Sequence, residues 1–176
     1  MDKIIKILLT CLSALLVGNL LLKYINYKLE NLRTENVETK YTTMAERERQ
    51  LECLARNIYF EAGKESFEGK VAVAQVTINR SESGIFPSDI CKVIYQKNIF
   101  MERIVCQFSW YCEPQANKKV LFQDSYSECY AVAKKVLLEG FRLEILNEAM
   151  YYHANYVKPR WRKEKVAVIG NHIFYK

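Results

Sequence analysis

Residues 57–80, NIYFEAGKESFEGKVAVAQVTINR, place a glutamate where the apolar face of a helix should continue. Four residues at or just before this stretch follow the i, i+3, i+4, i+7 spacing of an amphipathic helix: Leu51, Leu54, Ala55 and Ile58. Glu61 comes three residues after Ile58 and extends the same face, and Gly63 predicts the end of the helix. The sequence therefore predicts a carboxylate at the C-terminal end of a buried helical face.

The rest of the chain predicts a helix-rich α+β fold with a small C-terminal antiparallel β-sheet. Four helices are expected to begin at hydroxyl-bearing caps: Thr42 or Thr43, Ser66, Ser88 and Ser125. Glu128 would complete a capping box in the last of them, which should end at Gly140. Apolar runs on both sides of Gly170-Asn171 predict a β-hairpin, and residues 149–153 could form a neighbouring strand.

The composition is that of an ordinary folded protein, with 176 residues of which 50% are hydrophobic and 26% charged. The formal net charge of +6 suits an anionic polymer or surface. No basic stripe interleaved with aromatic residues stands out, so we do not expect a nucleic acid partner.

The N-terminal segment predicts a signal anchor. Residues 7–22 carry no charge and are flanked by Lys6 and Lys23. A helix of this length falls short of a ~30 Å hydrocarbon core unless neighbouring residues contribute, and no small-residue cleavage site follows it. We expect an anchor at residues 1–26, a polar linker at 27–43 and a catalytic domain at 44–176. The domain would then face the periplasm or the exterior from the inner membrane, although the lysine and arginine counts do not settle this orientation.

The cysteines indicate an oxidising compartment. The chain has six cysteines, and Cys106 and Cys112 bracket the short stretch CQFSWYC, where a disulfide would close a small loop. Free buried thiols are the alternative, because connectivity does not follow from sequence. No C-x-x-C pair is present, and His153 and His172 lie far apart in sequence. We therefore expect neither a metal nor a cofactor.

The position of Glu61 suggests acid catalysis. Desolvation disfavours a charged carboxylate and raises its pKa, so that it can hold a proton near neutral pH, as a general acid must. The alternative is a solvated or paired glutamate at a helix end. Glu65 and Glu68 lie in a polar turn beside Lys64 and Lys70, where exposure to solvent is the simpler expectation.

Several blocks of the sequence resemble the SleB-type cell wall hydrolases, the family of the spore cortex-lytic enzymes. They are LARNIYFEAGKESFEGKVAVAQVTINR, FPSDICKVIYQ, CQFSWYC, YYHANYVKPRW and IGNHIFYK, in this order between residues 54 and 176. The resemblance implies a lysozyme-like fold, cleavage of peptidoglycan glycan strands and Glu61 as the catalytic acid. The family usually has E-A-R-G-E at this acid, whereas Lys64 and Glu65 follow Gly63 here.

The resemblance also implies a mechanism and a saccharide cleft. Glu61 would act as the single acid of a lytic transglycosylase that leaves 1,6-anhydromuramyl ends. A hydrolytic muramidase would need a second carboxylate, for which Glu65 and Glu68 are candidates beside Glu113 and Asp124. The residues expected to contact the glycan are Gln107, Phe108, Ser109, Trp110, Tyr111, Tyr152, His153 and Asn155.

Other functions stay open at this stage. A stem-peptide amidase or cysteine peptidase would pair a thiol with His153, and a non-catalytic module would only bind the wall. The expected partners are peptidoglycan strands and, through the N-terminal helix, a membrane, with the chain acting as a monomer. A marginal anchor would also permit release from the membrane, as in phage endolysins with a signal-arrest-release segment.

Overall fold

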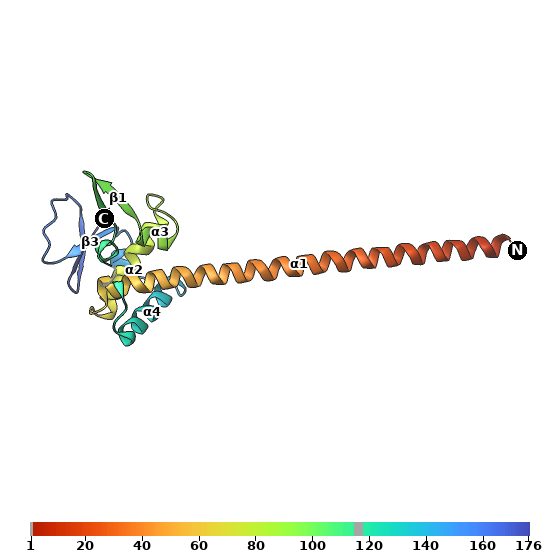
Figure 1. Cartoon of the computed structure of the whole chain (residues 1–176), viewed down its shortest axis with the longest axis horizontal. Coiled ribbons are helices and arrows are strands. Elements are labelled where there is room, and N and C mark those ends of the chain that lie inside the picture. Colours follow the sequence, from red (N-terminus) through yellow and green to blue (C-terminus); the bar gives the residue numbers. More distant parts are fainter. Residues whose placement is uncertain (1, 115–117) are drawn as a thin grey trace. The chain divides into compact units, whose positions relative to one another are not determined.

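The computed structural model describes residues 2–114 and 118–176, without the side chains of residues 2, 4, 8, 10, 11, 14, 32–42 and 100. The chain divides into two units, Met1–Glu46 and Arg47–Lys176. Helix α1, Asp2–Ala62, contributes to both units, and all other helices and strands belong to the second (Figure 1). The second unit begins three residues after the start that we predicted for the catalytic domain.

The first unit is a single helical segment. Residues 27–43, predicted to be a polar linker, continue α1 because they contain neither glycine nor proline to interrupt it. A cap at Thr42 or Thr43 was therefore a wrong prediction. Within the described residues no helix is both long and apolar enough to cross a membrane, so the anchor predicted at residues 1–26 is not supported. The side chain of Cys11 lies outside the described residues.

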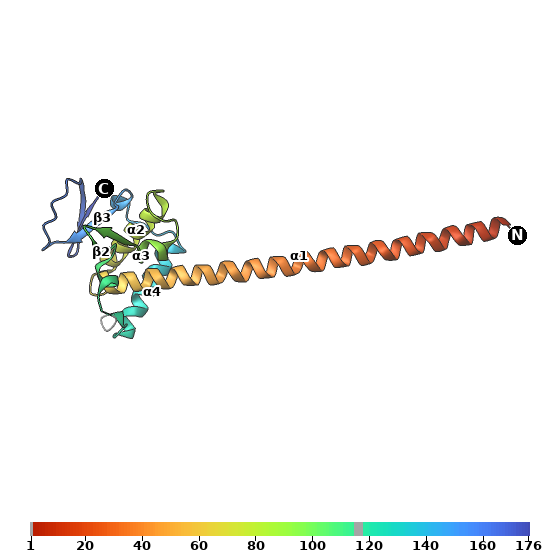
Figure 2. The ribbon, with the colours of Figure 1, turned by 45° about the horizontal axis from the view of Figure 1, so that its top comes forward.

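The core of the second unit forms where α1 packs on three further helices, α2 (Phe67–Glu82), α3 (Ile90–Ile94) and α4 (Gln123–Leu137). The apolar face predicted before Glu61 is buried, since Leu54, Ala55 and Ile58 are inaccessible to solvent. Helix α2 is buried along most of its length and lies between α4 and the C-terminal sheet (Figure 2). Glu61 therefore lies in the last turn of a helix that packs tightly in the core.

Two further predicted helix starts, at Ser88 and Ser125, are also wrong. Ser66 caps α2 as predicted, and its Oγ accepts a hydrogen bond from the Gly69 amide at 3.3 Å. Helix α3 is capped by Asp89, not Ser88, and α4 starts at Gln123 without a side-chain cap. Ser125 instead donates to the Gly63 carbonyl at 3.3 Å, and Glu128 pairs with Lys70 at 2.8 Å. Tertiary contacts use the side chains that would have formed the capping box.

The C-terminal sheet has the predicted form. Strands β3 (Tyr151–Ala154), β4 (Lys165–Ile169) and β5 (His172–Tyr175) form an antiparallel sheet in the order β3-β5-β4. Gly170 adopts a positive φ of 55° in the β4–β5 turn, which confirms the predicted hairpin. Phe174 and Ala167 pack on Ala72 of α2 and attach the sheet to the helices.

One hairpin and one of the two disulfides were not predicted from the sequence. Strands β1 (Lys97–Phe100) and β2 (Arg103–Cys106) pair antiparallel, and the short helices η1 (Ser109–Cys112) and η3 (Glu144–Leu146) follow them. The disulfide Cys106–Cys112 confirms the predicted pairing and closes the loop that carries η1. A second disulfide, Cys53–Cys91, joins α1 to α3, while Cys129 is free and buried.

Candidate active site

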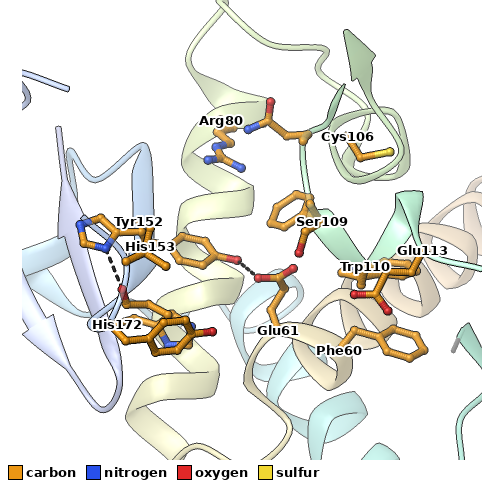
Figure 3. Close-up of a pocket in the computed structure, with 15 residues that line it drawn as sticks. Phe60, Glu61, Arg80, Cys106, Ser109, Trp110, Glu113, Tyr152, His153 and His172 are labelled. Atoms are coloured by element: carbon orange, nitrogen blue, oxygen red, sulfur yellow. Dashed lines mark hydrogen bonds between the residues drawn. The ribbon is translucent and has the colours of Figure 1, made fainter. Parts of the chain in front are cut away.

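A pocket of about 440 Å³ opens at the C-terminal end of α1. Five parts of the chain line it, and the lining residues are Phe60 and Glu61 from α1, Arg80 from α2, residues 106–110 and Glu113 around η1, residues 152–154, 156 and 157 around β3, and His172 from β5. Figure 3 shows the Glu61 carboxylate between the η1 side chains and those of the sheet. The pocket therefore joins residues that are up to 112 positions apart in sequence, from Phe60 to His172.

Glu61 is a partly buried acid that faces this pocket. Burial raises the pKa of Glu61, and the negative charge of Glu113 raises it further. The hydrogen bond from Tyr152 and the positive charge of Arg80 act in the opposite direction. Burial has the largest effect, so the carboxyl group retains its proton to a higher pH than an exposed glutamate does.

Tyr152 is the direct partner of this acid. Its hydroxyl donates a 2.9 Å hydrogen bond to Oε2 of Glu61 (Figure 3). Burial, and then the negative charge of Glu61, raise the pKa of Tyr152 well above 10, so the phenol remains a donor at neutral pH. Because Tyr152 lies in β3, next to the central strand of the sheet, the sheet holds the orientation of the Glu61 side chain.

Arg80 is a buried cation beside the acid and is only 4% exposed. Its Nε donates to the Met150 carbonyl at 2.8 Å, and the guanidinium lies 5.2 Å from the ring centroid of Phe108. When the Gln107 amide is oriented with its oxygen toward Arg80, that oxygen accepts from both terminal nitrogens at 3.1 and 3.2 Å. These contacts hold a positive charge near Glu61 without a direct ion pair between them.

Aromatic residues form one wall of the pocket. Phe60 stacks on Trp110 with ring centroids 4.6 Å apart and an angle of 21° between the planes. Nε1 of Trp110 donates a 2.9 Å hydrogen bond to Oδ1 of Asn57. Asn57 is fully buried, so this bond is shielded from water. Phe108 and Trp110 are both buried, so most of their surface packs in the core although both residues line the pocket.

The two histidines have opposite environments. His153 uses both ring nitrogens, since Nδ1 lies 2.8 Å from the Ala154 carbonyl oxygen and Nε2 lies 2.8 Å from the Tyr175 hydroxyl. His172 is 7% exposed, and among the described residues its buried Nδ1 has no hydrogen-bond partner. Burial lowers the pKa of His172, so the ring is neutral at neutral pH. His153 lines the pocket as predicted, but it is held by the protein.

The structure brings together most of the predicted contact residues and separates the others. Those that line the pocket are Gln107, Phe108, Ser109, Trp110, Tyr152 and His153. Tyr111 and Asn155 are not among the lining residues; the Tyr111 ring packs against Tyr95, 4.8 Å away between centroids. Sequence reasoning missed the lining roles of Phe60, Arg80 and His172. Only Phe60, next to Glu61, had a local indication.

Neither Glu65 nor Glu68, the proposed second carboxylates, lines the pocket. Glu65 accepts from the backbone amide of Asn171 at 3.2 Å and from its side-chain amide at 2.9 Å. A Cβ at Gly170 would overlap the Glu65 carboxylate. Glu65 thus ties the turn after α1 to the β4–β5 hairpin, while Glu68 is exposed in the first turn of α2.

This contact predicts a structural effect for Glu65. Glu65→Ala is expected to lower the free energy of unfolding by about 1–3 kcal/mol, because two hydrogen bonds are lost and the Asn171 donors are left without their acceptor. Chemical denaturation would measure it. Glu68→Ala serves as the control and should cost less than about 1 kcal/mol, the contribution of an exposed acid near a helix N-terminus. Equal losses in the two variants would contradict the assigned contact.

Comparisons with known proteins agree with this fold. The spore cortex-lytic enzyme of Bacillus subtilis (strain 168) is 28% identical over 128 residues, which cover 70% of this chain and 36% of that protein. The enzyme of the same name from Oceanobacillus iheyensis is 28% identical over 130 residues, covering 72% and 41%. The chain thus spans about two fifths of the length of these relatives.

A solved structure shows the same architecture. The catalytic domain of the Bacillus cereus SleB protein superposes with a TM-score of 0.55 at 23% identity, covering 73% of this chain and 91% of that domain. Residues 64–175 match the family described as Cell Wall Hydrolase, and Glu61 lies three residues before the matched range. Because the match covers more than half of the sequence, the chain belongs to the cell wall hydrolase family.

Proposed function

We propose that this chain cleaves the glycosidic bond between N-acetylmuramic acid and N-acetylglucosamine in peptidoglycan, with Glu61 as the general acid. The observation that carries the proposal is the partly buried Glu61 carboxyl, whose pKa is raised by burial and which is hydrogen-bonded to Tyr152 inside an open pocket. Glycosidic bond cleavage requires such an acid, because the leaving oxygen must be protonated as its bond to carbon breaks.

The geometry suggests a sequence of two proton transfers. Tyr152 donates to Oε2 of Glu61, so the transferable proton would reside on Oε1 and pass to the bridging oxygen of the glycan. The resulting carboxylate is stabilised by the Tyr152 hydroxyl and by the charge of Arg80. It would then remove the proton of the muramyl 6-hydroxyl, which attacks the anomeric carbon and forms a 1,6-anhydro ring without consuming water.

A hydrolytic outcome is the second candidate, and Glu113 is the residue that favours it. Glu113 lines the same pocket, and its charge raises the pKa of Glu61. An inverting or retaining hydrolase needs a second carboxylate that activates water or forms a glycosyl intermediate. Glu113, rather than Glu65 or Glu68, would have that role in this chain.

The thiols give little support to a cysteine peptidase. Four cysteines are paired in disulfides, and Cys129 is buried in α4 away from the pocket. Burial raises the pKa of Cys129 to about 11, which disfavours the nucleophilic thiolate. Within the described side chains, therefore, no free thiol faces His153.

The products of digestion test the proposal. The full chain is incubated with purified peptidoglycan, and the masses of the soluble muropeptides are measured by mass spectrometry. A lytic transglycosylase yields ends that are lighter by one water molecule than those of a hydrolase. Cleaved stem peptides with intact glycan would contradict both candidates, and hydrolysed reducing ends that disappear in Glu113→Gln would establish the second.

Tyr152→Phe provides a test by pH dependence. The hydrogen bond from Tyr152 lowers the pKa of Glu61, so its loss should raise that pKa further. Since the acid must be protonated to act, the alkaline limb of the pH profile of kcat/KM should move to higher pH. We expect kcat to fall as well, by about 10-fold, since the hydrogen bond orients the acid and stabilises its carboxylate. An unshifted alkaline limb would contradict this role for Tyr152.

We also propose that the second unit works outside the cytoplasm, in the periplasm or beyond. The disulfides Cys53–Cys91 and Cys106–Cys112 support this location, because oxidising compartments maintain such bonds. Alkylation of whole cells before lysis tests it. If Cys53, Cys91, Cys106 and Cys112 were all alkylated without prior reduction, the result would contradict the proposed location.

A further inference from the structure

A second pocket lies next to the catalytic one, on the other side of strand β3. It has a volume of about 300 Å³ and shares His153 and Val157 with the catalytic pocket. In the β3–β5 register, Tyr152 and His172 lie on the sheet face toward α2, whereas His153 and Ile173 lie on the opposite face. Because β3 is an edge strand of the described sheet, the two pockets meet around this edge.

The chain segment that contributes most of the lining of this second pocket is rich in basic residues. Residues 156–165, YVKPRWRKEK, here called the basic segment, carry five basic residues and one acidic residue. This excess of four charges accounts for most of the net +6 of the chain. Lys158 and Lys163 line the pocket. The one acid, Glu164, already pairs with Lys176 at 3.3 Å. In the part of the chain that the structure describes, Lys158 has no hydrogen-bonding or ion-pairing partner.

An aromatic wall completes the pocket. Trp161 lies 5.7 Å from Tyr175 and 5.8 Å from His153 between ring centroids. Lys163 holds its ammonium 3.4 Å from the centre of the Tyr151 ring, which fixes a positive charge at the pocket margin. Flat aromatic surfaces with fixed cations suit a ligand that combines planar amide groups with carboxylates.

We propose that this second pocket binds the carboxylate-bearing peptide stem of the muramyl unit whose glycan backbone lies at Glu61. The inference rests on the proposed function and adds the substrate feature that the enzyme recognises. A stiff glycan strand would have to bend sharply around β3, whereas a flexible branch from the sugar can cross the edge at His153 and Val157. Phosphates of polymers attached to the same strands share the anionic chemistry, and the test below separates the two sources.

The test measures binding, so that it does not depend on turnover. The full chain carrying Glu61→Gln is titrated with soluble glycan strands that keep their peptide stems and with strands stripped of them by an amidase. Both substrates are first treated with hydrofluoric acid to remove phosphodiester-linked polymers. We expect peptide-bearing strands to bind about tenfold more tightly, a ratio that two partly exposed charge contacts can supply.

The variants then assign the preference to the second pocket. Adding Lys158→Gln and Lys163→Gln should bring the two dissociation constants close together, while Lys158→Arg with Lys163→Arg should keep them apart. The charge-matched control is Lys92→Gln with Lys134→Gln, which changes two exposed lysines of α3 and α4 and should preserve the ratio. Thermal unfolding checks that each variant is folded.

Each outcome decides the inference. Equal binding of both strand types, or a ratio that survives Lys158→Gln with Lys163→Gln, overturns it. Equal binding of the two treated strand types, with tighter binding of both when the hydrofluoric acid treatment is omitted, assigns the site to phosphate and overturns the peptide assignment. If digestion by the unmodified chain gives no glycan cleavage while the binding ratio behaves as expected, the proposed function fails and the second pocket stands as a stem-binding site.

Discussion

Replacing Glu61 with glutamine is expected to lower kcat for peptidoglycan cleavage by about 10²–10⁴-fold, the range attributed to a positioned general acid. Glutamine keeps the size of the side chain and an oxygen that can accept the Tyr152 hydrogen bond, but it has no acidic proton to transfer. Release of soluble glycan fragments from purified peptidoglycan would measure the loss. A variant that retains most of its activity would remove the basis of the proposed function.

The stability of the same variant provides its control. Burial raises the pKa of Glu61, so the folded state holds this proton more tightly than the unfolded chain does. The corresponding stabilisation is complete below the unfolded pKa and is lost as the pH rises through the higher folded pKa. At neutral pH, Glu61→Gln should therefore have a Tm equal to or above that of the unmodified chain. A lower Tm at neutral pH would mean that misfolding contributes to lost activity.

Removing the Cys53–Cys91 disulfide is expected to have the largest effect on stability. The bond closes a loop with a sequence separation of 38 residues, for which the chain-entropy estimate is about 4 kcal/mol. The variant Cys53→Ala with Cys91→Ala should therefore unfold at a much lower guanidinium concentration. Both side chains are buried between α1 and α3, so the lost packing adds to the effect.

The other disulfide is the matched control. Cys106–Cys112 spans a sequence separation of only 6, and the same estimate assigns it about 2 kcal/mol. Cys106→Ala with Cys112→Ala should thus cost less global stability. The loop that this disulfide closes carries Ser109 and Trp110 at the pocket. Removing the disulfide should therefore lower activity clearly even though the loss of stability is small. A larger stability loss from this second pair would contradict the estimate.

The sequence allowed the local part of the site to be predicted. The apolar spacing before Glu61 placed the acid on a buried helical face, and the Gly170-Asn171 turn located the hairpin that carries His172. The helix caps were less predictable, since Ser125 and Glu128 had the spacing of a capping box but bond to Gly63 and Lys70 instead. A short spacing pattern does not include the competing partners that folding brings close.

The basic segment shows the same limit on a larger scale. Its charges were visible in the sequence, yet they did not stand out as a binding stripe because they follow one another in a single loop. Only the packing of Trp161 against the outer face of the sheet makes a pocket beside Lys158 and Lys163. Fold context, rather than composition, distinguishes such a pocket from a solvated run of lysines and arginines.

The sequence by itself determined the buried helical face that ends at Glu61, the C-terminal hairpin and the family, because these depend on periodicity, turn residues and short blocks of neighbouring residues. Only the tertiary structure decided that Tyr152 would hold the acid, that Arg80 and Glu113 would act on its pKa from opposite directions, and that Glu65 would bind a turn. Desolvation and electrostatic effects depend on distances between side chains that are far apart along the chain, and only the folded core brings those side chains together.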